Sequence, residues 1–539
     1  MKAAIHIEFM DMNREELNQL LERAQASLSP EDYRKVQGLV EALSYVTDLV
    51  ADQQTTIRDL RELLFPAATE KTAAVLKKAG LERTTKPADK PDEQRPGERK
   101  QKAPGHGRNG AKDYRNPRRV TVRHASLKHG DRCPGCLKGK VYEQKEPRQL
   151  VRIVGQAPLT ATVYDLQCLR CNLCGEVYSA DAPEGVGDDK YEESAAAMIA
   201  QLKYGTGMPF YRLENLEQNL GVPLPASTQW EIVEEAAELI KPALDELIRQ
   251  AAQGEVVHND DTSMRVLELR RAIIEEAGDR TGIFTSGVVS KAEGRKIALF
   301  FTGRQHAGEN LADVLKRRAA GLPTPIQMSD ALSRNAPKPI KLLIAHCLAH
   351  ARRQFVQIMP NFPEPCRHVL EALGEVYHQD QLARERGLSR VERLHHHQQY
   401  SKPVMDDMHQ WMEAQVNEHK VEPNSGLGKA IAYMLRHWQA LTLFLREPGA
   451  PLDNNLVERA LKKAILHRRN SLFYKTLNGA DVGDLYMSLI HTCELNEANP
   501  FDYLAELQRH TEELAAKPAE WMPWNYREAL TRAGGRTGV

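Results

Sequence analysis

Long apolar runs are missing from this sequence, and only 6% of its 539 residues are aromatic. A membrane-spanning helix needs about twenty mostly apolar residues, so the sequence predicts no span and no membrane partner. The first residues also lack the apolar core of a secretory signal. We therefore expect a cytoplasmic protein. Its length predicts several domains, because single cores usually stop growing at about 250–300 residues.

A net charge is also missing, since 73 Lys and Arg balance 73 Asp and Glu. The balance hides a local excess, because residues 71–120 carry fifteen Lys or Arg against six Asp or Glu. Repeated prolines such as Pro87, Pro91 and Pro96 cannot propagate a helix there. The pattern predicts a basic flexible linker that follows phosphates, or else an inert solvated linker.

Apolar residues recur at alternating spacings of three and four from Val36 to Leu64. This spacing keeps one seam on one side of a helix and predicts a short coiled coil, and with it a homo-oligomer. An amphipathic helix packed on its own domain is the alternative. Gln53 interrupts the seam and is a candidate for fixing its register.

Cysteine is scarce, yet five of the eight cysteines lie between Cys133 and Cys174. In a reducing compartment such a cluster favours metal binding over disulfides. Cys133 with Cys136 and Cys171 with Cys174 form two pairs, and this spacing is typical of a zinc ribbon with a structural Zn2+. Cys168 is an alternative ligand. The remaining cysteines, expected to be ordinary buried thiols, are Cys347, Cys366 and Cys493.

A helix-turn-helix pattern occupies residues 208–230. Residues 208–216 are amphipathic, Gly221 begins a turn, and a second helix opens at Ala226. If the second helix enters a major groove, residues near its start contact DNA. These candidates are Ser227, Thr228, Gln229 and Glu231. A plain helical hairpin gives the same pattern.

From about residue 255 the pattern changes to strands, with one helix among them, which predicts an α/β core. The expected strands are 255–260, 282–290, 296–303, 325–330 and 341–347, with the helix at about 308–320. Residues 348–450 read as helical and polar. Another helix begins just after Asp453.

Three acids fall at strand ends and a helix start of this core. Asp260 and Asp330 end two expected strands, and Glu458 lies about one turn into the helix that follows Asp453. Nucleic-acid phosphoryl transfer commonly uses two divalent ions about 4 Å apart. Such hard ions prefer carboxylate oxygens, so the three acids are candidate metal ligands.

Each acid has an alternative interpretation. Asp261 replaces Asp260 if the strand faces the other way, because neighbours on a strand point to opposite faces. Asp330 can instead form a turn, and Glu458 can be an exposed helix residue beside Arg459.

Three motifs surround the acids. They are His258-Asn-Asp260-Asp261-Thr262, Gln327-Met-Ser-Asp330 and Asp453-Asn-Asn-Leu-Val-Glu458-Arg459. Together with Cys347-Leu-Ala-His350-Ala-Arg352-Arg353, they resemble insertion-sequence transposases of the sixty-six family, which carry an Asp-Asp-Glu site on a ribonuclease H-like fold. The sequence departs from the family pattern after Asp330, where Ala331-Leu332-Ser333 replaces a Gly and an aromatic residue.

The resemblance implies a DNA transposase that binds terminal inverted repeats, cleaves DNA and transfers strands. Asp260, Asp330 and Glu458 would hold two Mg2+ ions, for which Mn2+ can substitute. Double-stranded DNA, at the nucleoid, and small accessory proteins of the element are the implied partners. The alternatives are a catalytically silent zinc-containing DNA-binding protein and a structure-specific nuclease of the same fold.

Further candidates for DNA contact are basic, because Arg suits bidentate phosphate contacts, although an ion pair with a surface acid is equally compatible. They are Arg304, His350, Arg352, Arg353 and Arg459. We expect a multidomain α+β chain. Its parts are an N-terminal coiled-coil region (1–70), a basic linker (71–118), a zinc ribbon (119–182), a helix-turn-helix region (183–250), a ribonuclease H-like core (251–347 and 448–492), a helical insertion (348–447) and a helical tail (493–539).

Overall fold

The computed structural model describes most of the chain after residue 119. The described residues are 120–143, 149, 150, 152, 153, 156–174, 176–183, 186, 189–276, 280–292 and 294–534. The predicted coiled coil and basic linker lie outside these residues. Within them the fold is mixed α+β. None of the described helices combines the length and the apolar character that crossing a bilayer requires.

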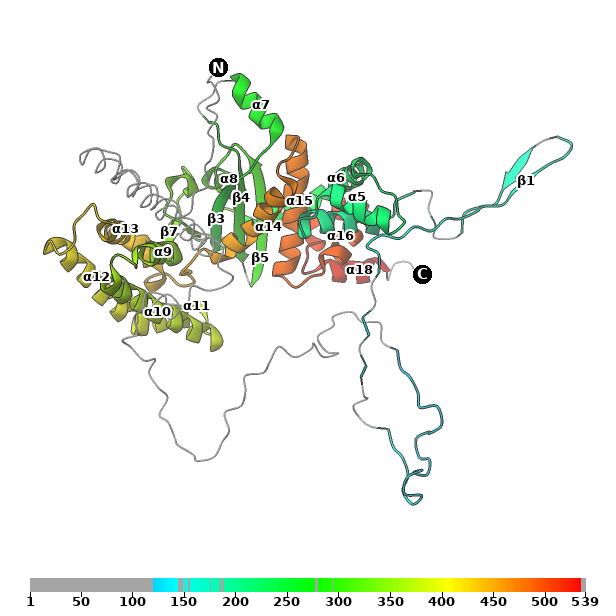
Figure 1. Cartoon of the computed structure of the whole chain (residues 1–539), viewed down its shortest axis with the longest axis horizontal. Coiled ribbons are helices and arrows are strands. Elements are labelled where there is room, and N and C mark those ends of the chain that lie inside the picture. Colours follow the sequence, from blue (N-terminus) through cyan, green and yellow to red (C-terminus); the bar gives the residue numbers. More distant parts are fainter. Residues whose placement is uncertain are drawn as a thin grey trace, which may run out of the picture. The chain divides into compact units, whose positions relative to one another are not determined.

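A five-stranded mixed sheet lies at the centre of the fold, in the order β5-β4-β3-β6-β7 (Figure 1). Its strands are β3 (Val256–Ser263), β4 (Phe284–Ala292), β5 (Arg295–Gly303), β6 (Ile326–Ser329) and β7 (Leu343–His346). β3, β4 and β5 are antiparallel neighbours, whereas β6 and β7 run parallel to β3. Parallel strands need a crossover, and α8 (Ala307–Leu315) lies in the one between β5 and β6. The predicted helix at 308–320 therefore ends earlier than expected.

Two helices cover opposite faces of this sheet. A Cβ built on Gly287 of β4 would lie 3.0 Å from Leu461 of α14 (Asn455–Ser471). The adjacent Ser286 accepts a hydrogen bond of 2.9 Å from Asn310 of α8. Because neighbours on a strand face opposite sides, α14 lies on one face and α8 on the other.

The edge strand β5 is covered by α15 (Leu477–Leu495) rather than by another strand. Every fourth side chain from Asp484 to Asn496 forms a hydrogen bond with the backbone of every second residue of β5. The pairs are Asp484 with Thr302, Ser488 with Phe300, Thr492 with Ala298, and Asn496 with Lys296. Four helix residues rise about 6 Å and two strand residues about 6.6 Å, so the two spacings match. The helix thereby satisfies an edge that could otherwise pair with another chain.

Residues 210–251 form the two helices expected of the helix-turn-helix pattern, α5 (Phe210–Asn219) and α6 (Ala226–Ala251). α6 has 26 residues, and its buried residues recur at helical spacing, as at Val233, Ile240 and Leu247. This face packs against α15 and the sheet. α6 is therefore a structural layer of the core as well as the second helix of the motif.

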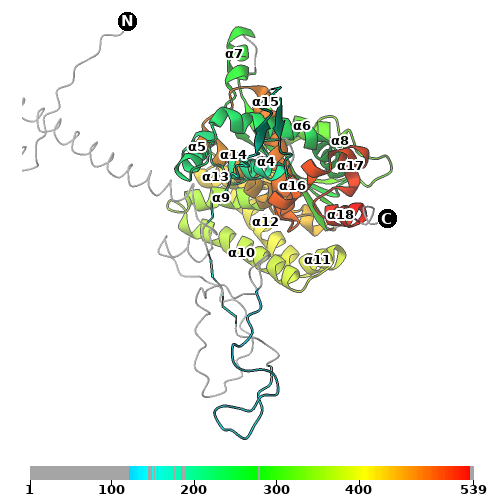
Figure 2. The same ribbon diagram turned by 90° about the vertical axis from the view of Figure 1, so that its right-hand side faces the viewer.

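The predicted helical insertion is helical in the structure, and its helices pack on one another (Figure 2). Its elements are α9 (Leu348–Ile358), α10 (Pro363–Glu385), α11 (Arg390–His396), η4 (His397–Ser401), α12 (Lys402–Asn417), α13 (Gly426–Leu441) and η5 (Leu443–Leu445). The other elements are β1 (Cys168–Arg170), β2 (Val177–Ser179), α4 (Glu193–Ala200), η2 (Gln201–Gly205), α7 (Leu267–Glu276), η3 (Ser333–Asn335), α16 (Pro500–Arg509), α17 (Thr511–Ala516), η6 (Pro518–Glu520) and α18 (Tyr526–Gly534).

The edge contact predicts a pH-dependent stability. Burial raises the pKa of Asp484 to about 8 from 3.8, against the opposing effect of its hydrogen bonds from Thr302. A raised folded-state pKa means that the folded chain keeps a proton that the unfolded chain loses. Wild-type stability relative to Asp484→Asn should therefore fall from about pH 4 to about pH 8 and then level off. Urea unfolding across this range measures the difference.

Two further variants complete this test. Asp484→Leu leaves the Thr302 N–H without its acceptor and should cost about 1–3 kcal/mol at every pH. Glu512→Gln changes an exposed acid on α17 and serves as the control. If the difference in unfolding free energy between wild type and Asp484→Asn stays constant with pH, Asp484 has the same pKa in the folded and unfolded states.

Candidate active site

Asp260 lies within a strand and not at its end. The predicted boundary is wrong because β3 continues to Ser263, paired with β4 throughout. The parallel partner β6 is shorter, and its pairing with β3 stops at His258 and Met328. Asp260 therefore lies just beyond the end of β6, where Asp330 follows that strand.

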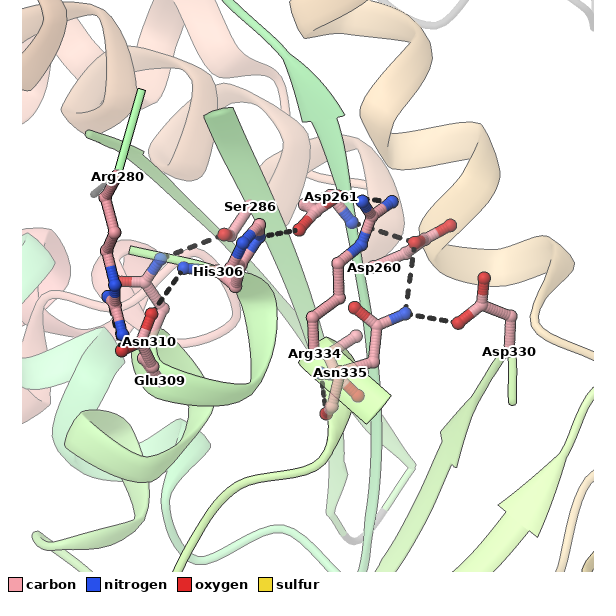
Figure 3. Close-up of polar contacts among 11 residues, drawn as sticks. Asp260, Asp261, Arg280, Ser286, His306, Glu309, Asn310, Asp330, Arg334 and Asn335 are labelled. Atoms are coloured by element: carbon pink, nitrogen blue, oxygen red, sulfur yellow. Dashed lines mark hydrogen bonds and ion pairs between the residues drawn. The ribbon is translucent and has the colours of Figure 1, made fainter. Parts of the chain in front are cut away.

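The two faces of β3 separate Asp260 from Asp261. Asp260 is the direct neighbour of Gly287, whose missing side chain faces α14. Asp261 points to the other face, where its buried carboxylate contacts Nδ1 of His306 at 3.0 Å and Nη2 of Arg334 at 3.2 Å (Figure 3). Asp260 is thus the acid on the α14 face, and the carboxylate of Asp261 already has two basic partners.

Asn335 joins the first two acids. Its side chain is fully buried, and its Nδ2 donates to Oδ1 of Asp330 and, at 3.4 Å, to Oδ1 of Asp260 (Figure 3). Its backbone oxygen accepts hydrogen bonds from Asn259 and Gln327, at 2.8 and 2.6 Å. The short turn η3 is thereby tied to two neighbouring strands, which holds the bridging amide between the carboxylates.

Glu458 approaches from the first turn of α14. The residue before this helix, Asn454, is buried, with Oδ1 3.1 Å from Nδ1 of His258 and Nδ2 donating to the backbone oxygen of Asn259 at 3.2 Å. These contacts fix the start of α14 against β3. His258 therefore positions the helix that carries Glu458 and makes no hydrogen bond to Asp260 in the described structure.

Asp260 lies among other negative charges. Burial, together with the charges of Asp330 and Glu458, raises the pKa of Asp260 to about 7. Buried acids that repel one another are stabilised by a bound cation. Because all three donors are carboxylates, the site suits a hard divalent ion such as Mg2+. The buried Oε1 of Glu458, which has no hydrogen-bond partner, fits the same interpretation.

Two predicted DNA contacts require correction. The side chain of Gln229 is fully buried and donates to the backbone oxygen of Leu224 at 2.9 Å, so it does not face DNA. Arg352 is 8% exposed and lies inside the insertion, near Tyr377. Both residues fall on the inner face of their helices, which the sequence positions alone did not reveal.

The other predicted contacts are at least partly accessible. Ser227, Glu231, Arg353 and Arg459 are exposed, and Thr228, Arg304 and His350 are half-buried. Arg353 and His350 line a pocket of about 270 Å3 together with Asp330 and Tyr433. This pocket places two of the basic candidates directly beside the second acid.

A group of arginines near the end of β3 was not anticipated. Nη1 of Arg468 donates to Oγ1 of Thr262 at 3.1 Å, two residues from Asp260. Burial lowers the pKa of Arg468, and the charges of Arg469 and Arg265 lower it further. Three arginines that repel one another near the end of the strand that carries Asp260 suit a polyanionic ligand.

The four predicted zinc ligands form two separate turns. Leu137 N–H donates to the backbone oxygen of Cys133 at 2.9 Å and Gly139 N–H to Sγ of Cys136 at 3.4 Å. Cys171 and Cys174 lie in the turn between β1 and β2. The alternative ligand Cys168 starts β1, with Sγ 3.2 Å from Oγ of Ser179.

The described residues do not bring these four sulfurs together. The one group of three or more metal-type side chains found among them, with ligand atoms within 4.8 Å of one another, is Cys347, His350 and Glu458. Each cysteine pair has the turn that a zinc knuckle uses, and the joined zinc ribbon stays a prediction.

The bridging amide predicts a specific metal phenotype. Asn335→Ala removes the donor shared by Asp260 and Asp330, so the two carboxylates should splay and Mn2+ affinity should fall about 10–100-fold. Isothermal titration with Mn2+ measures the affinity, and thermal unfolding in EDTA measures the loss of apo stability.

Asn310→Ala is the matched control for this variant. Asn310 is also a buried amide, but it donates to Ser286 and touches neither acid. It should lose stability while keeping wild-type Mn2+ affinity. Equal loss of affinity in both variants would show that Asn335 acts through general stability alone.

Comparison with known proteins places the site in context. The family model described as Transposase IS66 family matches residues 190–482, which include all three acids. Two similar proteins are the uncharacterized proteins y4hP and y4jD of Sinorhizobium fredii (strain NBRC 101917 / NGR234). The first is 29% identical over 350 residues, 61% of each chain. The second is 28% identical over 358 residues, 62% of this chain and 66% of its own. The chain thus spans less than two thirds of these relatives.

Proposed function

Because the chain belongs to the IS66 family of transposases, we propose that it is a DNA transposase that cleaves and joins DNA strands at Asp260, Asp330 and Glu458. The observation that supports this proposal is that Asp330, just after β6, and Glu458, in the first turn of α14, lie close enough to Asp260 of β3 for their charges to raise its pKa. The sheet itself, with three antiparallel strands followed by two parallel ones, supports a ribonuclease H-like core.

Two divalent ions at this site would activate the attacking oxygen and stabilise the leaving oxygen of an in-line displacement. Neighbouring residues of the chain hold the three carboxylates in position. Asp260 and Asp330 are held by the amide of Asn335, and Glu458 enters from a helix fixed at Asn454. The pocket beside Asp330 offers Arg353 to a phosphate of the bound strand. The same site would first nick an element end and then join its 3′-hydroxyl to target DNA.

DNA binding in this proposal uses several surfaces. Arg265, Arg468 and Arg469 lie near the end of β3, and Ser227 and Thr228 lie in the first turn of α6. The predicted linker and zinc ribbon would add sequence-independent contacts, and the predicted coiled coil would join copies of the chain at the two element ends. This work takes place in the cytoplasm, at the nucleoid, with any accessory proteins that the element encodes.

The triad predicts linked effects on catalysis and stability. Asp260→Asn and Glu458→Gln should abolish Mg2+-dependent cleavage and strand transfer and leave binding to element ends intact. At about 100 times its Kd, Mg2+ should stabilise the wild type by about 2.7 kcal/mol, and Asp260→Asn should lose most of this gain. Without metal, Asp260→Asn should be the more stable protein, because it removes a buried charge.

Asp261→Asn decides between the neighbouring acids. It should keep the Mg2+-dependent gain in stability, since Asp261 faces His306 and Arg334. If Asp261→Asn abolishes that gain and Asp260→Asn does not, the assignment of the first acid is wrong. Cleavage without joining would instead indicate a nuclease, and DNA binding without either would indicate a catalytically silent protein.

The arginine group predicts a change in salt dependence. Each phosphate contact contributes about 0.9 to the slope of log K against log salt for B-DNA. The double variant Arg265→Gln and Arg469→Gln should therefore reduce the slope by about 2, uniformly across DNA sequences. Fluorescence anisotropy at several salt concentrations measures it. Arg532→Gln, an exposed arginine of α18, is the control and should leave the slope unchanged.

A further inference from the structure

Three different metal-binding side chains meet where β7, α9 and α14 come together. Cys347 directly precedes α9, His350 lies in its first turn, and Glu458 lies in the first turn of α14. One ligand atom of each residue lies within 4.8 Å of the others. Cys347 is 1% exposed, so its thiol faces this junction and not solvent.

Two buried polar atoms at the junction lack hydrogen-bond partners. Nδ1 of His350 and Oε1 of Glu458 are both buried and make no hydrogen bond. They are 3.7 Å apart, which is too long for a hydrogen bond. Buried polar atoms are nearly always paired, so two facing unpaired atoms require an explanation. An ion between them would satisfy both.

The donor types select the class of ion. Mg2+ takes oxygen ligands and does not favour sulfur. A thiolate, an imidazole and a carboxylate together suit Zn2+, and three protein ligands leave a fourth position for water. Sγ of Cys347 already accepts the Asn454 N–H at 3.2 Å, which holds the sulfur in place. Binding would release the thiol proton of Cys347 to solvent, and His350 would offer the lone pair of its Nδ1.

An entry path to this position exists. The pocket of about 270 Å3 beside Asp330 is lined by His350 and Tyr433 and is open to solvent at Arg353. An ion can therefore approach His350 from solvent. The same pocket is the space in which the nucleic-acid strand would lie.

We propose that Cys347, His350 and Glu458 form a Zn2+ site that overlaps the carboxylate triad through Glu458. Zn2+ bound there draws the carboxylate of Glu458 toward Cys347. It thereby competes with Mg2+ for the Glu458 carboxylate. Zn2+ is thus an inhibitor of the Mg2+ site. The inhibition rests on the proposed function, whereas the binding site does not.

Binding is tested on the full chain with Co2+ and Zn2+ alone. Co2+ should produce a thiolate charge-transfer band that Cys347→Ser abolishes in part, and wild type should bind one more equivalent of Zn2+ than Cys347→Ser. Cys366→Ser, an equally buried thiol on α10, is the matched control and should bind as wild type does. The double variant Cys133→Ser and Cys136→Ser removes the predicted ribbon site and should leave the Cys347-dependent equivalent in place.

Inhibition is tested by Mg2+-dependent cleavage over a Zn2+ series. The inhibition constant of Zn2+ should rise at least about tenfold in His350→Gln relative to Cys366→Ser. His350 is half-exposed, so this variant keeps the test valid if Cys347→Ser fails to fold. Equal Zn2+ stoichiometry in wild type, Cys347→Ser and His350→Gln would overturn the site. A Cys347-dependent equivalent in a chain that never cleaves DNA would leave the site standing and refute the proposed function.

Discussion

The partial burial of Asp260 among neighbouring carboxylates is the constraint on which the surrounding structure depends. Without a cation, burial and the neighbouring acids raise the pKa of Asp260 to about 7, so the fold must hold these groups together at a cost. Three residues around the carboxylates hold them together. Gly287 lets α14 pack closely on β4, Asn454 ties the start of that helix to β3, and the amide of Asn335 lies between two of the acids.

The opposite face of β3 supports this arrangement. Asp261 holds Arg334, the residue next to Asn335, and His306 at the start of α8. A Cβ on Gly308 would lie 2.7 Å from the backbone oxygens of Arg334 and Ala336, so α8 presses directly on the turn that carries Asn335. Neighbouring acids on one strand therefore have different tasks. Asp260 lies on the face of β3 that meets α14, and Asp261 anchors the turn that carries Asn335.

The sequence predicted the acids because their motifs are local, and it predicted the sheet from apolar runs. It did not separate Asp260 from Asp261, since that choice depends on which face of β3 meets α14. Asn335 gave no signal, because its role arises from a turn folded back between two strands. Gln229 and Arg352 were wrongly predicted to contact DNA, because the residues at the start of a helix do not reveal which face of the helix is buried. The polar residues from Asp484 to Asn496 recur every four residues in the sequence, but nothing in the sequence identified β5 as the strand that they contact.

Contacts between the two ends of the insertion explain how Glu458 is positioned although many residues separate it from β7. Its two ends are joined, because Leu348 N–H donates to the backbone oxygen of Leu452 at 3.0 Å and Asn454 N–H donates to Sγ of Cys347 at 3.2 Å. These bonds close the insertion at its base and hold Asn454, the residue before α14, beside Cys347. The closure also explains why Cys347 lies beside Glu458. Cys347 precedes the insertion and contacts Asn454 at its far end, and Asn454 directly precedes the helix that carries Glu458.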